Sequence, residues 1–109
     1  MNIADLAPRA DDAAELLGAM ANPKRLLILC NLLNEELSVN DLAERVGLAQ
    51  SPLSQHLGKL RAMKLVATRR EGQMIYYRLA SQSVERMLTT LYDIYCSPGQ
   101  SSRARKESA

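Results

Sequence analysis

The chain lacks a long apolar run and the sequence features of secretion. No stretch of its 109 residues approaches the roughly 18 consecutive apolar side chains that a membrane helix needs. The N-terminal stretch MNIADLAPRADDAAELL is acidic, whereas a signal peptide begins with basic residues. We therefore expect a cytoplasmic protein with no membrane partner.

Metal ligands and paired thiols are also scarce. The chain has one histidine, His56, and two cysteines, Cys30 and Cys96, which lie far apart in the sequence. No Cys-x-x-Cys motif is present, so neither a thioredoxin-type centre nor a zinc knuckle is indicated. No His or Arg adjoins either cysteine to activate it, which disfavours a thiol enzyme such as a peroxidase. We predict no metal, no cofactor and no enzymatic activity.

The composition that is present fits one small folded domain. Hydrophobic residues make up 47% of the chain and charged residues 24%, enough apolar side chain to build a core. The segment SPGQSSRARKESA at 97–109 contains helix breakers and no large apolar residue, which predicts a disordered tail. Residues 1–96 are then the folded domain.

Basic charge is concentrated in one segment. The formal net charge is only +2, but six basic side chains fall between residues 59 and 78, against Glu71 alone. Lys and Arg neutralise phosphates, so this asymmetry is the pattern expected of nucleic-acid binding. A solvated basic face is the alternative interpretation, because charge clusters are common on protein surfaces.

Helical spacing and helix-capping residues predict four helices before the basic segment. The first covers 11–20. The second covers 21–36, is apolar on most sides and should be central, with Asn22 as its N-cap and Pro23 at its first position. A short third helix at 37–47 has Ser38 as its cap and Gly47 as its left-handed stop. A fourth helix within 48–65 is predicted to start at Ser51 and Pro52 after a link of about four residues, as in a helix-turn-helix.

A hairpin and a last helix complete the domain. Two β-rich runs at 66–70 and 74–79 are joined by a turn that contains Gly72. The segment 83–96 then has a broad apolar stripe at helical spacing, formed by Val84, Met87, Leu88, Leu91, Ile94 and Tyr95. The fold class is mainly α with a small β-hairpin, and the element order is that of a winged helix-turn-helix.

The fourth helix has the residues of a DNA-reading helix. Leu53, Leu57 and Leu60 fall on one side, which must be buried, and the opposite side is polar. Gln can pair bidentately with adenine, Lys can bind a phosphate or guanine, and Ser can bond a base edge or phosphate. A merely solvated helix face is the alternative. The predicted DNA contacts are Ser51, Ser54, Gln55, His56 and Lys59 on this helix, with Arg69 and Arg70 on the hairpin.

These motifs resemble those of a known family. From Ala19 to Leu79 the chain is similar to the ArsR family of small bacterial winged-helix repressors, most specifically in SQHLGKLR and REGQMIYYRL. The resemblance implies a homodimer, formed by the first and last helices, that binds an imperfect palindromic operator in double-stranded DNA and leaves it when an inducer arrives. A dimer also follows from the reading helix, since two half-sites one helical turn apart raise affinity and select spacing.

The same resemblance narrows what the protein senses. One family metal site uses cysteines in the third helix, where this chain has Ser38 and Asn40, and another needs histidine on the last helix, whereas His56 lies in the reading helix. The positions of Cys30 and Cys96, and the ending LYDIYC, resemble the sulfide- and redox-responsive branch of the family. That resemblance implies that reactive sulfur species or polysulfides link the two cysteines within a subunit, as a disulfide or polysulfide, and release the operator.

Three observations weigh against thiol sensing. A lone cysteine in an apolar helix is usually an inert core residue, and AMANPKRLLIL also resembles a nodulation-regulating branch in which both cysteines would be incidental. Neither thiol is activated by its predicted surroundings, because Cys96 ends a helix and Cys30 lies among leucines.

Overall fold

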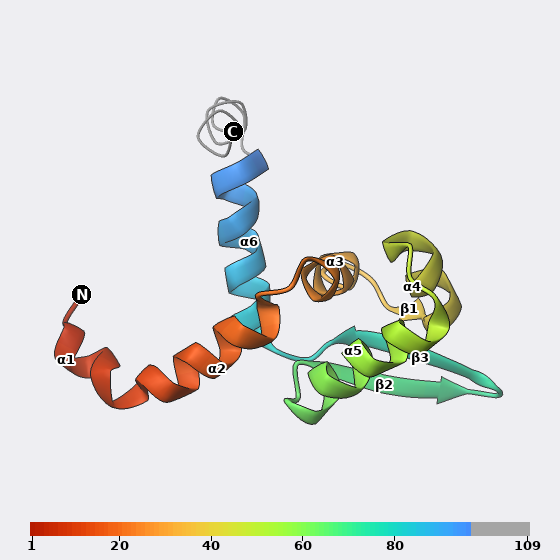
Figure 1. Cartoon of the computed structure of the whole chain (residues 1–109), viewed down its shortest axis with the longest axis horizontal. Helices are drawn as coiled ribbons and strands as arrows, with labels where there is room; N and C mark the ends of the chain where they lie inside the picture. The colour runs from red at the N-terminus through yellow and green to blue at the C-terminus, as the bar shows by residue number, and fades with distance from the viewer. Residues whose placement is uncertain (97–109) are drawn as a thin grey trace.

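The described part of the chain, residues 1–96, is mainly helical with one small antiparallel sheet (Figure 1). The tail predicted at 97–109 lies outside the described residues. In this computed structural model the elements follow one another as α1 (Ile3–Leu6), η1 (Ala7–Arg9), α2 (Ala10–Met20), α3 (Pro23–Asn31), β1 (Leu37–Ser38), α4 (Val39–Val46), α5 (Gln50–Ala62), β2 (Val66–Glu71), β3 (Met74–Leu79) and α6 (Gln82–Cys96). The predicted winged helix-turn-helix is confirmed.

The sheet has three strands rather than the two predicted. Its order is β1-β3-β2, with β2 and β3 forming the predicted hairpin and β1 pairing with β3 at Leu37 and Ser38. The first hairpin strand runs to Glu71, one residue further than expected, and Gly72 turns the chain with a φ of 62°. Such positive φ values are typical of tight hairpin turns, and glycine adopts them without strain.

One buried apolar cluster joins the helices to the sheet. The three leucines predicted to face inward from α5, Leu53, Leu57 and Leu60, are all at most 1% exposed. They pack with residues of α3, α4, α6 and β2 in a single core. The core therefore fixes which face of α5 is left for solvent.

Helix capping follows the sequence at two of the three predicted starts. The Asn22 side chain accepts the N–H groups of Lys24 and Arg25, and Ser38 accepts the N–H of Asp41. Gly47 ends α4 with a φ of 66°, as expected for a left-handed stop.

Two local predictions were wrong, and two short elements were not predicted. Helix α5 begins at Gln50 with Ala49 as its N-cap, so Ser51 lies inside the first turn; the Ala49 carbonyl already accepts the Leu53 N–H at 3.2 Å. Helix α3 ends at Asn31 instead of continuing to residue 36, because the following residues lead into β1. Residues 3–9 form α1 and η1, which the sequence pattern did not indicate.

Helix α3 is central on one side only. Ile28 and Leu29 are fully buried, whereas Leu27 is 46% exposed and Cys30 is exposed as well. The expectation of an all-round apolar environment for Cys30 is therefore corrected: its thiol reaches the surface.

Candidate nucleic-acid interface and thiol pair

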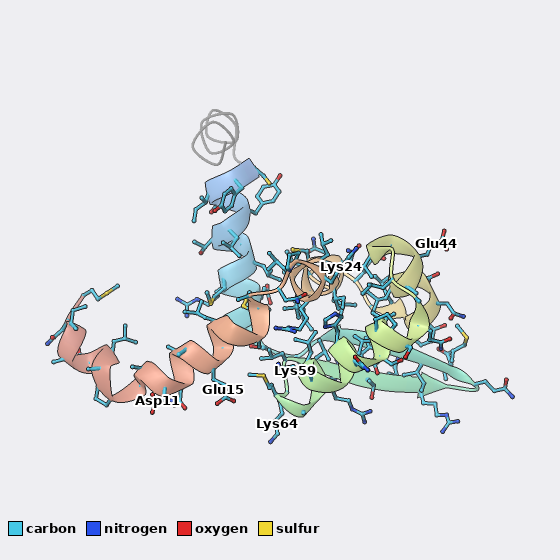
Figure 2. The ribbon with its side chains drawn as sticks, in the orientation of Figure 1. Asp11, Glu15, Lys24, Glu44, Lys59 and Lys64 are labelled. Carbon is cyan, nitrogen blue, oxygen red and sulfur yellow. The ribbon has the colours of Figure 1, made fainter. Side chains whose placement is uncertain are left out.

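Helices α4 and α5 form the helix-turn-helix, and α3 holds its turn. The Lys24 Nζ donates a hydrogen bond of 2.9 Å to the Val46 carbonyl at the end of α4. Figure 2 shows Lys24 at α3, close to the α4 end, and Lys59 on α5. A cation at a helix C-terminus satisfies a free carbonyl and complements the helix dipole, so this contact stabilises the turn that sets the angle between α4 and α5.

The polar face of α5 is open. Ser51, Ser54, Gln55 and Lys59 are exposed, and His56 is half-buried at the edge of the core. Within residues 1–96 no hydrogen bond engages any of these five side chains, and a Cβ added at Gly58 would meet nothing within 4 Å. The structure thus brings the five predicted α5 residues together on one accessible helix, with donors and acceptors available for a ligand.

The two predicted wing arginines differ in their surroundings. Arg69 donates to Glu36 at 2.6 and 2.9 Å and to Glu71 at 2.8 Å, and its guanidinium lies 4.7 Å from the centre of the Tyr76 ring. The hydrogen bond from Arg69 lowers the pKa of Glu36, and those from Arg69 to Glu36 and Glu71 raise the pKa of Arg69. Arg70 is exposed and donates only to the Gly72 carbonyl, at 3.2 Å.

Sequence reasoning missed the partners of Arg69. Alternation of strand side chains places Arg69 beside Tyr76, its cross-strand neighbour in the hairpin, and that contact was readable from the predicted strands. The contact between Arg69 and Glu36 could not be read from the sequence, because Glu36 precedes β1, a strand that was not predicted.

The two thiols are exposed, unbridged and electrostatically coupled. Both cysteines are free, Cys30 on α3 and Cys96 at the end of α6. Partial burial raises the pKa of Cys30, and the charge of Cys96 raises it further. The raised pKa of Cys30 agrees with the expectation of an unactivated thiol.

The described residues offer little else that binds a ligand. No group of three or more His, Cys, Asp or Glu side chains in them is placed to hold a metal ion. Among residues 1–96 there is also no helix long and apolar enough to span a membrane.

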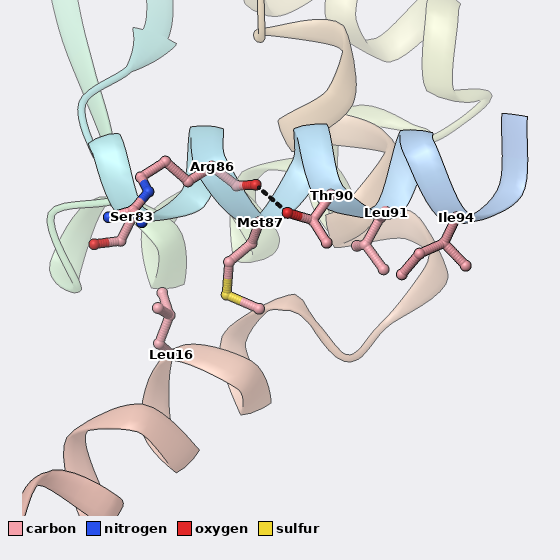
Figure 3. Close-up of a pocket in the computed structure, with 7 residues that line it drawn as sticks. All are labelled: Leu16, Ser83, Arg86, Met87, Thr90, Leu91 and Ile94. Atoms are coloured by element: carbon pink, nitrogen blue, oxygen red, sulfur yellow. Dashed lines mark hydrogen bonds between the residues drawn. The ribbon is translucent and has the colours of Figure 1, made fainter. Parts of the chain in front are cut away.

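A second surface, on α2 and α6, is apolar and exposed. Leu16 of α2 and Met87, Leu91 and Ile94 of α6 line a pocket between the two helices (Figure 3). Other large apolar side chains of the same helices also remain in solvent, with exposed fractions of 51% for Leu17, 62% for Tyr92 and 53% for Tyr95, and Ile94 in the pocket is 47% exposed. Large apolar side chains exposed on two neighbouring helices are typical of an interaction surface in a small protein.

The fold and the open helix define the class of this molecule. A helix-turn-helix whose second helix presents unpaired polar side chains, followed by a basic β-wing, is a winged helix-turn-helix DNA-binding protein. The family model of bacterial regulatory proteins of the arsR family matches residues 22–68. The chain belongs to the arsR family of transcriptional regulators.

Characterised relatives cover most of the chain. The nodulation protein NolR of Rhizobium meliloti is 59% identical over 79% of this chain and 70% of its own length. The transcriptional activator HlyU of Vibrio cholerae is 47% identical over 92% of this chain and 93% of its own. Of these two relatives, HlyU is named as a regulator of transcription.

Solved structures agree with the fold. The transcriptional repressor BigR from Xylella fastidiosa superimposes with a TM-score of 0.85 at 38% identity, over 89% of this chain and 99% of that one. A homodimeric winged helix-turn-helix domain from Mycobacterium bovis superimposes with a TM-score of 0.69 at 35% identity, over 78% and 79% of the two chains. Homodimers thus occur among the structural relatives.

Proposed function

We propose that this protein is a homodimeric repressor that binds an imperfect palindromic operator and releases it when Cys30 and Cys96 become linked by reactive sulfur species. The open polar face of α5 carries the DNA-binding part of the proposal. In the proposed complex α5 lies in the major groove and the hairpin reaches the adjacent backbone or minor groove.

Each residue of α5 has a chemical role in that complex. Gln55, near the middle of the helix, pairs with a base edge, while Lys59 binds a phosphate or guanine. Ser51 and Ser54 bond phosphates or base edges near the helix N-terminus, where the dipole favours anions. His56, at the edge of the buried side, contacts the backbone, and Arg70 contributes a cation from the wing.

The apolar surface of α2 and α6 supports the dimer. Covering Leu17, Ile94 and their neighbours with a second copy would remove a large apolar patch from water, the main driving force of protein association. Two α5 helices at a fixed distance would then read two half-sites, and the homodimeric relative supports this arrangement.

The proposed release begins with a thiolate that attacks a low-molecular-weight persulfide, RSSH. Attack at its outer sulfur forms a cysteine persulfide and expels RSH. The second cysteine then attacks the sulfur bonded to the first cysteine and expels H₂S, which leaves a disulfide. If the second cysteine has also become a persulfide, the same displacement leaves a trisulfide. The two thiols lose two electrons, which reduce the outer sulfur of a persulfide to H₂S, so the persulfide itself is the oxidant and no other is needed.

The raised pKa of Cys30 favours sulfur species over peroxide as the inducer. A thiol that is mostly protonated at neutral pH reacts slowly with peroxide, and only a more reactive electrophile converts it at a useful rate. Linking α3 to α6 would strain the surface that sets the spacing of the two α5 helices, and a shift of an ångström or two there is enough to weaken specific binding.

DNA-binding anisotropy of reduced, persulfide-treated and peroxide-treated protein, with mass spectrometry of both cysteine peptides, tests the proposal. Reduced protein should bind, persulfide should release it with a mass change at Cys30 and Cys96, and low peroxide should not. The variants Cys30→Ser and Cys96→Ser should bind DNA normally and resist release.

The second candidate is an arsR-family regulator without thiol sensing, which the 59% identity to NolR favours. Its signature in the same experiment is release of both serine variants by persulfide as efficiently as wild type, or no release of any of them. Loss of binding in Gln55→Ala and Lys59→Ala is expected under both candidates and tests the reading helix itself.

A further inference from the structure

The outer face of the sheet holds a cluster of side chains that DNA binding does not explain. Its members are Arg69, Tyr76, Glu36 and Glu71. Consecutive strand residues face opposite sides, so Arg69 and Arg70 cannot share a face. Arg70 shares its face with Val66, which is buried in the same cluster as Leu57 and Leu60 of α5. Arg69 lies on the face turned away from the reading helix.

The side chain of Arg69 crosses the sheet. It extends from β2, its guanidinium lies over the ring of Tyr76 on β3, and it donates to the carboxylate of Glu36, which immediately precedes β1. Tyr76 lies between its two partners in the sheet, because it is paired with Arg69 of β2 on one side and with Ser38 of β1 on the other. One side chain thus connects β2, β3 and the residue just before β1.

The same contacts leave Arg69 poorly suited to bind phosphate. Its Nε, Nη1 and Nη2 atoms all donate to carboxylates, and a phosphate at this position would meet two negative charges. Arg78 also lowers the pKa of Glu36. The two positive charges of Arg69 and Arg78 only balance the two negative charges of Glu36 and Glu71. The outer face therefore has no excess positive charge to attract DNA.

We infer that Arg69 is a positioning residue, which ties the wing to the start of the helix-turn-helix and makes no phosphate contact of its own. The strand that it reaches is only two residues long, and its second residue, Ser38, is the N-cap of α4. A side-chain link to Glu36 therefore holds the hairpin in a fixed orientation relative to α4 and α5. The inference rests on the proposed DNA binding. It changes the role predicted for Arg69 from a DNA contact to a clamp, a side chain that holds the wing in position.

The test is a charge swap measured by anisotropy on a fluorescein-labelled mixed-sequence DNA duplex of about 30 base pairs, over a series of KCl concentrations. Arg69→Glu alone places three carboxylates together and should weaken binding at least roughly tenfold. The double variant Glu36→Arg/Arg69→Glu has the net charge of wild type and restores the pair between positions 36 and 69 in reverse, though not the pair with the exposed Glu71. Affinity should therefore return to within roughly threefold of wild type, with the same salt slope.

The matched control is Glu36→Arg/Arg70→Glu, which has the same net charge but cannot form the reversed pair. This control should bind DNA more weakly than wild type. The slope of its log affinity against log salt concentration should be smaller than that of wild type by about one phosphate contact. Thermal unfolding followed by circular dichroism checks that every variant is folded.

The outcomes separate the clamp from its alternatives. If the Arg69 double variant stays as weak as Arg69→Glu, Arg69 contacts phosphate and the inference is overturned. Equal recovery of both double variants would mean that binding follows net charge alone, which also overturns it. Wild-type protein that binds no duplex would refute the proposed function itself.

Discussion

At the residue scale, Cys30 is defined by two neighbours of different kinds. The body of its helix buries the thiol in part, and Cys96 from α6 adds a second ionisable sulfur nearby. Both effects disfavour the thiolate, so the pKa of Cys30 lies above its ordinary value. Thiols that react slowly with weak oxidants can still undergo exchange with reactive sulfur species.

Alkylation of Cys30 should therefore be slow at neutral pH. With iodoacetamide, the rate at Cys30 is expected to rise with pH to a midpoint above that of a free cysteine peptide, because the folded protein holds the proton more tightly. Cys96→Ser should move the midpoint down but not fully to the peptide value, since burial is the larger cause. Peptide mass spectrometry after timed quenching measures it, and a midpoint at or below the peptide's would contradict the described environment.

Gly47 has a backbone conformation that other residues adopt with strain. Its φ of 66° ends α4, and an added Cβ would come no closer than 4.0 Å, to Lys24 Nζ. Gly47→Ala should lower the free energy of unfolding by about 1 kcal/mol through backbone strain rather than a clash.

The control for Gly47 is Gly58→Ala within α5, where a Cβ meets nothing within 4 Å. It should raise the free energy of unfolding by roughly 0.5–1 kcal/mol, because alanine is the better helix former. Urea unfolding of both variants gives the comparison, and a stabilised Gly47→Ala would show that the left-handed stop is not under strain.

At the element scale, the first turn of α3 serves three helices. Asn22 starts α3, Lys24 closes the end of α4, and Arg25 donates to the Ala19 and Gly18 carbonyls at the end of α2, at 2.6 and 3.2 Å. Two consecutive cations thus cap the C-termini of α2, which carries part of the exposed apolar surface, and of α4, the first helix of the helix-turn-helix. The start of α3 therefore ties these two helices together.

Removing the charge of Arg25 should weaken this junction. Arg25→Met keeps the aliphatic part of the side chain but removes the side-chain donor to the Ala19 and Gly18 carbonyls, so the free energy of unfolding should fall by about 1–2 kcal/mol. Arg61→Met is the control, since the exposed Arg61 side chain makes no hydrogen bond within residues 1–96. Equal effects of the two substitutions in urea unfolding would contradict the capping role.

At the scale of the whole molecule, two surfaces lie apart from each other. Figure 1 shows α2 and α6 extending away from the body that contains α4, α5 and the sheet. The apolar surface on the former and the polar helix on the latter divide the chain into a part suited to association and a part suited to binding DNA.

A charge on the apolar surface should produce a folded monomer. Ile94→Glu puts a carboxylate beside Leu91 and Met87, where a second copy would have to bury it, so sedimentation should change from the mass of a dimer to that of a monomer. Thr89→Glu, on the polar side of the same helix, should remain a dimer. A monomeric wild type, or a dimeric Ile94→Glu, would remove the support for this surface as the dimer interface.

Much of the fold was predictable because its determinants are local. Asn22, Ser38 and Gly47 act on backbone groups within a few residues of themselves, and the leucines of α5 show their buried side through spacing alone. Ser51 misled because a serine followed by proline is typical of a helix start, whereas the Ala49 carbonyl had already begun the helix.

The sequence by itself determined the order of elements, the buried side of the reading helix and the polar residues opposite it, because periodicity and capping are short-range effects. Only the tertiary structure decided that Arg69 pairs with Glu36, 33 residues away, and that Cys30 and Cys96 affect one another. A two-residue strand such as β1 has no pattern of its own, and it forms because β3 offers it a partner. That pairing also brings Glu36 within reach of Arg69, and it is the basis on which we infer a positioning role for this arginine.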